Sequence, residues 1–78
     1  EVRLREVNWL GDGPLDGERE VLARVRSTRR PVPALVRPAE AGAAVTLLSP
    51  EEGVAPGQAC VLYETEGTRV LGGGWIAR

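Results

Sequence analysis

The 78-residue sequence contains no histidine, lysine, methionine or phenylalanine, and it has a single cysteine. Without histidine, the chain lacks the side chain that most often serves as a general base, proton shuttle or metal ligand near neutral pH. One cysteine cannot form an internal disulfide, which fits a reducing compartment. These absences argue against a complete enzyme and against a metal centre built from this chain alone.

Long apolar runs are absent as well. No stretch approaches the roughly 20 apolar residues that cross a bilayer, and no signal-peptide pattern is present, so we expect a cytoplasmic protein without membrane contact. A chain this short makes one domain, and it buries only about 60% of the surface that its unfolded form exposes. Because the sequence opens on Glu1 rather than methionine, we expect residues 1–78 to be one domain of a longer protein.

The residues that are present indicate a β structure. Ten valines and nine leucines must supply most of the core, and we expect Trp9, Tyr63 and Trp75 to complete it. Apolar and polar residues alternate with period two, which is typical of strands with one buried face. In the most regular segment, Val21, Ala23 and Val25 share one face. The pattern predicts strands at 2–9, 21–26, 34–37, 43–48, 59–64 and 69–71, with 75–77 closing the chain.

Breaks in the pattern predict local features. The alternation slips at Glu6, which indicates a bulge in the first strand. Prolines at 31, 33 and 38 place strand 34–37 at a sheet edge or a bend. Residues 49–52 carry the signature of one short helical turn, and Pro56-Gly57 is typical of a type II turn.

About six short strands separated by glycine and proline turns, without a convincing helix, predict an all-β fold. The expected architecture is a small closed or nearly closed β-barrel, because closure removes the exposed edges that a short chain tolerates poorly. A sandwich is the alternative.

Two motifs invite functional interpretations that the context does not favour. Gly72-Gly73-Gly74 is followed by only four residues with strand character, whereas a phosphate loop needs a helix after it, so we expect a barrel kink or close backbone packing. Cys60 has no nearby base in the sequence, so we expect a half-buried structural cysteine. The carboxylates sit in or beside turns without a paired arrangement. We therefore expect no catalytic residue and no metal or cofactor site here.

Charge is distributed unevenly along the chain. The net charge is −1, but the stretch from Val21 to Ala39 contains five arginines and no acid. Either this stretch forms a face for an anionic partner, or it is a solvated strand surface; the charge pattern alone leaves both open. Guanidinium groups are suited to phosphate contacts and to stacking on bases. Gln58, at the exit of the Pro-Gly turn, is a candidate for a discriminating polar contact.

Four segments in this order resemble one known family. They are residues 7–10, residues 23–28 with 31–33, residues 53–63, and residues 70–76; the most specific part reads A-P-G-Q-A-x-V-x-Y … V-L-G-G-G-x-I. Together they resemble the C-terminal barrel of the tRNA-specific 2-thiouridylase family, over essentially the whole chain. The resemblance implies a barrel similar to the second domain of elongation factor Tu.

The resemblance also implies the chemistry of the longer enzyme. Such enzymes carry an N-terminal ATP-pyrophosphatase domain and a central domain. They use ATP and Mg²⁺ to activate C2 of the wobble uridine, and a cysteine persulfide charged by a sulfur-carrier protein then replaces the oxygen. The catalytic cysteines and the phosphate loop belong to those other domains. Cys60 is therefore not the persulfide carrier, and this domain would grip the anticodon arm of tRNA.

In this family the barrel contacts tRNA through an Arg-Tyr pair and through the glutamine of the Pro-Gly-Gln turn. By motif these positions are Arg26, Ser27 and Gln58, with Ser27 replacing the usual tyrosine so that only a hydroxyl contact remains. Arg24, Arg29 and Arg30 would add phosphate contacts. Two alternatives stay open: a bracing or protein-interaction barrel without RNA contact, and a stand-alone barrel like those of translation factors, which rests on fold analogy only.

Overall fold

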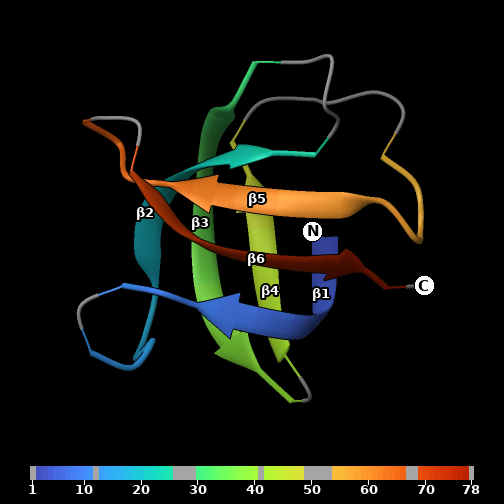
Figure 1. Cartoon of the computed structure of the whole chain (residues 1–78), viewed down its shortest axis with the longest axis horizontal. Coiled ribbons are helices and arrows are strands. Elements are labelled where there is room, and N and C mark those ends of the chain that lie inside the picture. The colour runs from blue at the N-terminus through green and yellow to red at the C-terminus, as the bar shows by residue number, and fades with distance from the viewer. Residues whose placement is uncertain are drawn as a thin grey trace.

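The computed structural model describes residues 2–11, 13–25, 30–40, 42–48, 54–66 and 69–77. These residues form six strands. They are β1 (Val2–Trp9), β2 (Arg19–Arg24), β3 (Val32–Ala39), β4 (Gly42–Leu47), β5 (Ala59–Tyr63) and β6 (Val70–Ile76). All pairings are antiparallel, and the order β1-β4-β3-β2-β5-β6 closes into a barrel (Figure 1). The predicted small closed barrel is confirmed, and the sandwich alternative is wrong.

Alternate residues of the strands fill the interior, as period-two patterning requires. Val21, Ala23 and Val25 all point inward and are at most 2% exposed, as the sequence predicts. Strands from both halves of the chain share one core, formed by Leu4, Val21, Ala23, Val25, Ala34, Val36, Ala43, Val45, Cys60, Leu62, Leu71 and Ile76. The barrel therefore needs no strand from elsewhere to close. No helix in the described ranges is long and apolar enough to span a bilayer.

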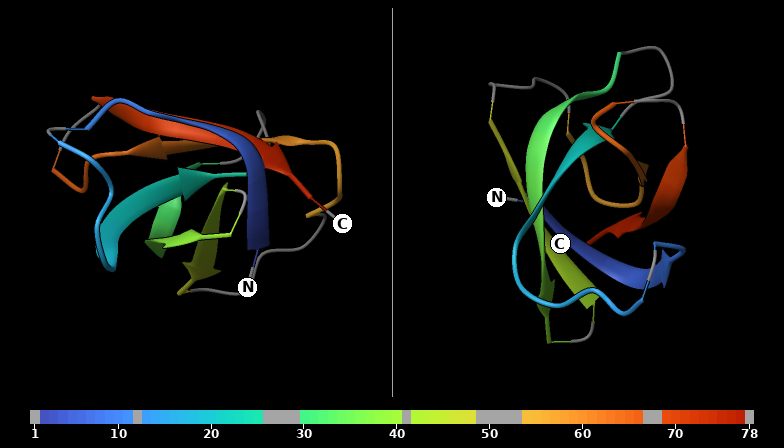
Figure 2. Two further views of the ribbon diagram at one scale, coloured as in Figure 1. Left: turned by 90° about the horizontal axis from the view of Figure 1, so that it is seen from below. Right: turned by 90° about the vertical axis from the view of Figure 1, so that its left-hand side faces the viewer.

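The predicted bulge in β1 is confirmed. Arg5 pairs with Trp75 and Asn8 with Gly73, so three steps along β1 correspond to two along β6. The extra residue is accommodated at Glu6, whose φ is 53°. A bulge bends its strand and increases its twist. The bend lets the first half of β1 pair with β4 while its second half continues along β6, as the two views of Figure 2 show.

The predicted interruption at Gly72-Gly73-Gly74 is wrong, because β6 is continuous from Val70 to Ile76. The expected close backbone packing is confirmed. A Cβ atom at Gly72 would overlap the carbonyl oxygen of Asn8, and one at Gly73 would lie 2.5 Å from the carbonyl oxygen of Cys60. Glycine is needed here because the backbones of β1 and β5 occupy the space of a side chain.

β2 has the predicted length of six residues but is shifted toward the N-terminus, and β3 is longer than the sequence predicts. β2 begins at Arg19 rather than at residue 21, and β3 includes Pro33 and Pro38. These prolines occupy the second and seventh of the eight positions of β3, so the missing N–H groups fall near its ends. The sheet-edge interpretation is wrong because a closed barrel has no edge. The helical turn expected at 49–52 lies outside the described residues.

The glycine packing predicts a stability effect. We expect Gly73→Ala to lower the free energy of unfolding by about 2–3 kcal/mol, because the added methyl group overpacks against β5. Gly13→Ala is the matched control: Gly13 has φ 80° and open space around it, so only conformational strain of about 1 kcal/mol is expected. Urea unfolding measures both. A loss for Gly73→Ala no larger than the control's would contradict the close-packing explanation.

Candidate nucleic-acid interface

The structure describes three of the six residues that the sequence assigns to tRNA. Arg24, Arg30 and Gln58 are described, whereas Arg26, Ser27 and Arg29 lie outside the described residues. The question for the described three is whether the barrel brings them to one side.

Arg24 and Gln58 lie at the same end of the barrel because β2 and β5 are antiparallel neighbours. Arg24 pairs with Val61, which follows Gln58 by three residues. At roughly 3.3 Å per residue, Gln58 lies about 10 Å along β5 from the position of Arg24. Arg24 belongs to the outward row of β2, since its neighbours Ala23 and Val25 are buried. Gln58 has the parity of the buried Cys60 and Leu62, so the two residues share an end of the barrel but not a face of the sheet.

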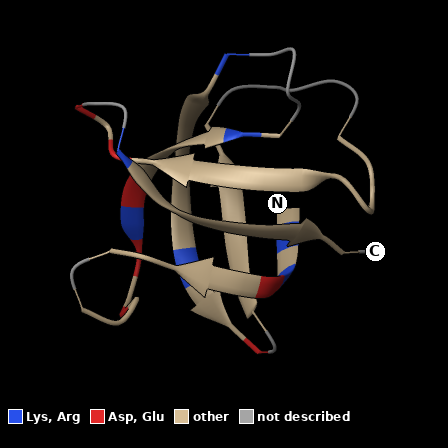
Figure 3. Cartoon of the chain, viewed as in Figure 1, with Lys and Arg blue, Asp and Glu red and all other residues tan. Residues whose placement is uncertain are grey.

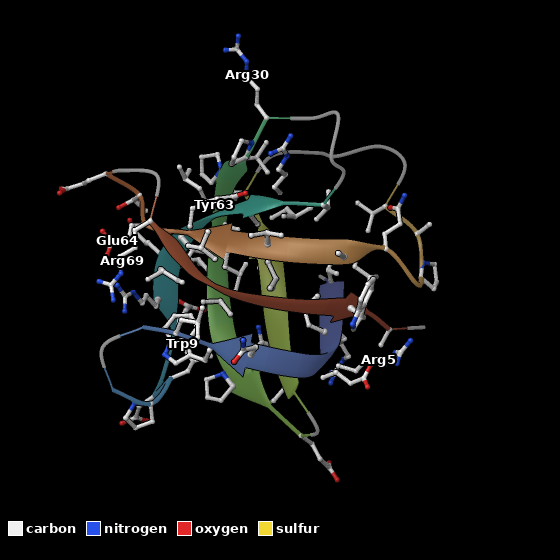
Figure 4. The ribbon with its side chains drawn as sticks, in the orientation of Figure 1. Arg5, Trp9, Arg30, Tyr63, Glu64 and Arg69 are labelled. Carbon is white, nitrogen blue, oxygen red and sulfur yellow. The ribbon has the colours of Figure 1, made fainter. Side chains whose placement is uncertain are left out.

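Arg30 joins them from the other side of β2. Val32 pairs with Ala23, so Arg30, two residues earlier, is at the end of the barrel where β2 finishes. Its side chain is exposed and extends away from the barrel (Figure 4). We call Arg24, Arg30 and Gln58 the basic end.

The fifth arginine of the basic stretch is not part of this end. Arg37 pairs with Ala44, and its neighbour Val36 pairs with Arg19 at the start of β2. The continuous charge of +5 in the sequence is therefore divided, because β3 runs the length of the barrel and carries Arg37 to the opposite end. Of the five arginines, only Arg24 and Arg30 are seen to share an end.

Acidic side chains gather away from the basic end. Glu20 at the start of β2 and Glu64 and Glu66 after β5 lie around one shallow hollow with Arg19. Figure 3 shows acidic positions, in red, on β2 and beyond the end of β5. Glu64 forms an ion pair with Arg69 at 2.9 Å. These acids lie at the other end of β2 and β5 from the basic end, but Arg19 and Arg69 lie among them, so the charge of the hollow is mixed.

The backbone of Gln58 is held rigidly. Gly57 has φ 89°, which the third position of the predicted type II turn requires, and the Gln58 N–H approaches the carbonyl of Ala55 at 3.4 Å. The Gly57 N–H donates to the carbonyl of Ile76 at 2.8 Å, and the Ile76 N–H donates to the carbonyl of Gln58 at 2.8 Å. The turn is therefore fastened to the end of β6.

The side-chain amide of Gln58 is not simply solvated. Its Oε1 atom is buried and has no hydrogen-bond partner among the described residues. A buried acceptor without a partner costs about 1–3 kcal/mol. Rotation of the side chain toward solvent or toward a ligand donor would recover that free energy.

Cys60 is a core residue. It is 1% exposed, more deeply buried than the sequence predicts, and desolvation raises the pKa of its thiol to about 11. A thiol with this pKa is almost entirely protonated at neutral pH, so it is a poor nucleophile.

The described residues also contain no group of three or more cysteine, aspartate or glutamate side chains arranged to hold a metal ion.

The expected core role of the aromatic residues is wrong for two of the three, since neither Tyr63 nor Trp75 belongs to the core or to the residues packed against it. Trp9 packs against the core, its Nε1 donates to the carbonyl of Gly13 at 3.0 Å, and Arg19 lies 5.6 Å from its ring centroid. Trp75, however, is 47% exposed. The next residue, Ile76, points inward, and because adjacent strand residues face opposite sides, Trp75 faces outward.

Comparison with known proteins identifies relatives over nearly the whole chain. A family profile described as "Aminomethyltransferase beta-barrel domain" matches residues 1–76. A protein of Paracoccus denitrificans named tRNA-specific 2-thiouridylase MnmA is 61% identical over 77 residues, which are 97% of this chain and 20% of the relative. Proteins of the same name from Dinoroseobacter shibae and Ruegeria pomeroyi are 58% and 56% identical, each over 80 residues, which are 99% of this chain and 21% of the relative. The chain spans about one fifth of these relatives.

Burial of Cys60 predicts slow thiol chemistry. At pH 8 the thiolate fraction of a thiol with a pKa near 11 is about 100-fold lower than that of a thiol with a pKa near 9. We expect alkylation of the native protein by iodoacetamide to be at least that much slower than alkylation of the protein in urea. Mass spectrometry over time measures both rates. Comparable rates would place Cys60 at the surface instead.

Proposed function

This chain belongs to the family of aminomethyltransferase β-barrel domains, and we propose that it is the tRNA-gripping domain of a tRNA-specific 2-thiouridylase. In this proposal the barrel is the C-terminal part of a longer cytoplasmic enzyme. The remainder, an ATP-pyrophosphatase domain and a central domain, thiolates C2 of the wobble uridine with sulfur from a persulfide. A sulfur-carrier protein supplies that sulfur. The names of the similar proteins and the basic end support the proposal.

ATP and Mg²⁺ would be used by the remainder of the enzyme. The described residues of the barrel offer no cluster of acidic side chains for a cation. In the proposal the barrel's own contribution is to bind and orient tRNA.

The observation that carries the proposal is the meeting of Arg24, Arg30 and Gln58 at one end of a closed barrel. Two guanidinium groups at this end suit phosphate oxygens, which position a nucleic acid without reading its sequence. Gln58, on a turn fastened to β6, can add a hydrogen bond to a base or a ribose hydroxyl once its amide rotates outward.

Arg26, Ser27 and Arg29 extend the same proposal on sequence grounds. Arg26 and Ser27 occupy the Arg-Tyr positions of the family motif, and all three follow directly after β2 in the chain. Serine cannot stack on a base as tyrosine can, so we assign Ser27 a hydroxyl hydrogen bond. The phosphate contacts of Arg29 and Arg30 would offset part of the binding free energy lost with the stacking contact.

Mapping by NMR tests the surface. We expect an anticodon stem-loop RNA, titrated into the 15N-labelled barrel at low salt, to shift the amides of Arg24, Arg30 and Gln58. Binding should weaken steeply as salt increases, because phosphate contacts release counterions. The amides of Glu64 and Glu66 at the acidic hollow are the internal control. Shifts of equal size at the control amides would contradict the proposed surface.

Substitution tests the same surface in a full-length enzyme. The host is the Paracoccus relative with its matching segment replaced by this chain. We expect Arg26→Ala and Arg30→Ala each to weaken tRNA binding by about 1–3 kcal/mol, the free energy of a lost charge-assisted contact. Each substitution should also reduce the slope of log affinity against log salt concentration by about one, because one fewer counterion is released on binding.

Arg37→Ala is the matched control, since Arg37 lies at the other end of the barrel. Filter binding at three salt concentrations measures all three variants. An unchanged affinity for Arg30→Ala, or an equal loss for Arg37→Ala, would mean that the basic end does not grip tRNA.

A further inference from the structure

A second surface feature lies on the outer face of β6 and adjoins the basic end, because Ala59 at its side follows Gln58 and Val61 pairs with Arg24. There β5, β6 and β1 border a groove of about 340 Å³. Trp75 stands at one end, and Leu10 and Val70 stand at the other. Ala59 and Val61 of β5 form one side, and the groove extends about 16 Å along β6 at roughly 3.3 Å per residue. Figure 1 shows these three strands side by side at the front of the barrel.

The groove follows directly from how the barrel closes. Gly72, Gly73 and Gly74 form its floor, and they are glycines because neighbouring backbones leave no room for Cβ atoms. Because the glycines have no side chains, the surface over this part of β6 is recessed relative to the side chains of the neighbouring residues. The hollow is therefore permanent, and it does not depend on the rotamer of any floor residue.

The exposed apolar side chains of the molecule concentrate at this groove. In the described part of the chain, four large hydrophobic residues are more than 40% exposed: Leu10, Leu48, Val70 and Trp75. Three of the four border the groove. Single exposed hydrophobic residues are ordinary, but a contiguous apolar patch marks an interaction surface.

The charges around the groove favour a protein occupant over a nucleic acid. Among the described residues no basic side chain lines it, and its one acidic residue, Glu6, forms an ion pair with Arg5 at 3.0 Å. The Arg5 guanidinium is thus already paired, and a phosphate would have to displace the Glu6 carboxylate to bind it. Depletion of charge together with an exposed tryptophan is the composition of a protein–protein interface core.

The length of the relatives indicates where the occupant comes from. The chain spans about one fifth of them, so four fifths of such a polypeptide would have to pack somewhere near this barrel. In the proposed arrangement the remainder precedes residue 1. The Ala77 N–H donates to the carbonyl of Arg3 at 2.8 Å, so the start of β1 lies two residues from Trp75 at the end of β6. A preceding domain therefore reaches the groove without a long linker.

We propose that the groove over Gly72–Gly74, between Trp75 and the Leu10–Val70 pair, is the docking site for an apolar surface of the remaining polypeptide of the enzyme. This inference rests on the proposed function, since that function supplies the remaining polypeptide. The barrel then has two working surfaces: the β6 groove holds it to the rest of the enzyme, and the basic end faces tRNA. Docking fixes the direction in which the basic end points.

Hydroxyl-radical footprinting tests this with unmodified side chains. The samples are the isolated barrel and the Paracoccus chimera, each with and without tRNA, and mass spectrometry measures the oxidation of Trp75. Leu48 is the matched control, because it is 56% exposed and lies outside the groove. We expect oxidation of Trp75 to fall about tenfold in the tRNA-free chimera, as a half-exposed ring becomes part of an interface core. The oxidation rate of Leu48 should change less than twofold.

Each other outcome overturns the proposal. Equal oxidation of Trp75 in the barrel and the tRNA-free chimera means that the groove stays open. Protection only after tRNA is added assigns the groove to RNA. Protection in the isolated barrel that increases with its concentration assigns it to a second copy. The Arg30→Ala binding experiment tests tRNA gripping separately. If gripping fails there, Trp75 should still be protected in the tRNA-free chimera, so the two failures can be told apart.

Discussion

The close approach of β6 to both β1 and β5 is the contact on which the structure depends. Gly72 lies against the backbone of Asn8, and Gly73 lies against that of Cys60, so the last strand enters a gap too narrow for side chains. When β6 fills this gap, the backbone N–H and C=O groups of β1 and β5 that face it form hydrogen bonds. The two edges that an open sheet would expose are thereby removed. The same contact produces the groove over Gly72–Gly74 and fastens the turn that carries Gln58 to Ile76.

Closure also places the two proposed activities on adjoining surfaces. The antiparallel pairing of β2 with β5 brings Arg24 and Gln58 to one end, although 33 residues lie between them in the sequence. The groove faces outward from β6, with paired charges at its rim. A polar, basic end suits an anionic partner, and an uncharged apolar groove suits a protein surface. One small barrel can therefore contact RNA and protein at once, because the two adjoining surfaces differ in chemistry.

Local patterns were sufficient for much of the fold. Alternation assigned the inward face of β2, and its slip at Glu6 located the bulge in β1, because side-chain direction reverses with each residue of a strand. The Pro56-Gly57 pair specified its own turn. Local patterns failed at Gly72–Gly74 and at the prolines of β3, where neighbouring strands decide whether a glycine or a proline interrupts a strand. That decision depends on pairing partners far away in the sequence.

The sequence by itself therefore determined the strand content, the bulge, the turn at Gly57 and the kinship to a family of barrel domains. Only the tertiary structure decided that Arg37 lies apart from Arg24 and Arg30, that Cys60 is fully buried and that Trp75 is exposed beside a groove. The physical reason is the same in each case. Strand patterning depends on neighbours one or two residues away, whereas burial and the grouping of charges depend on which strands the closed barrel places side by side.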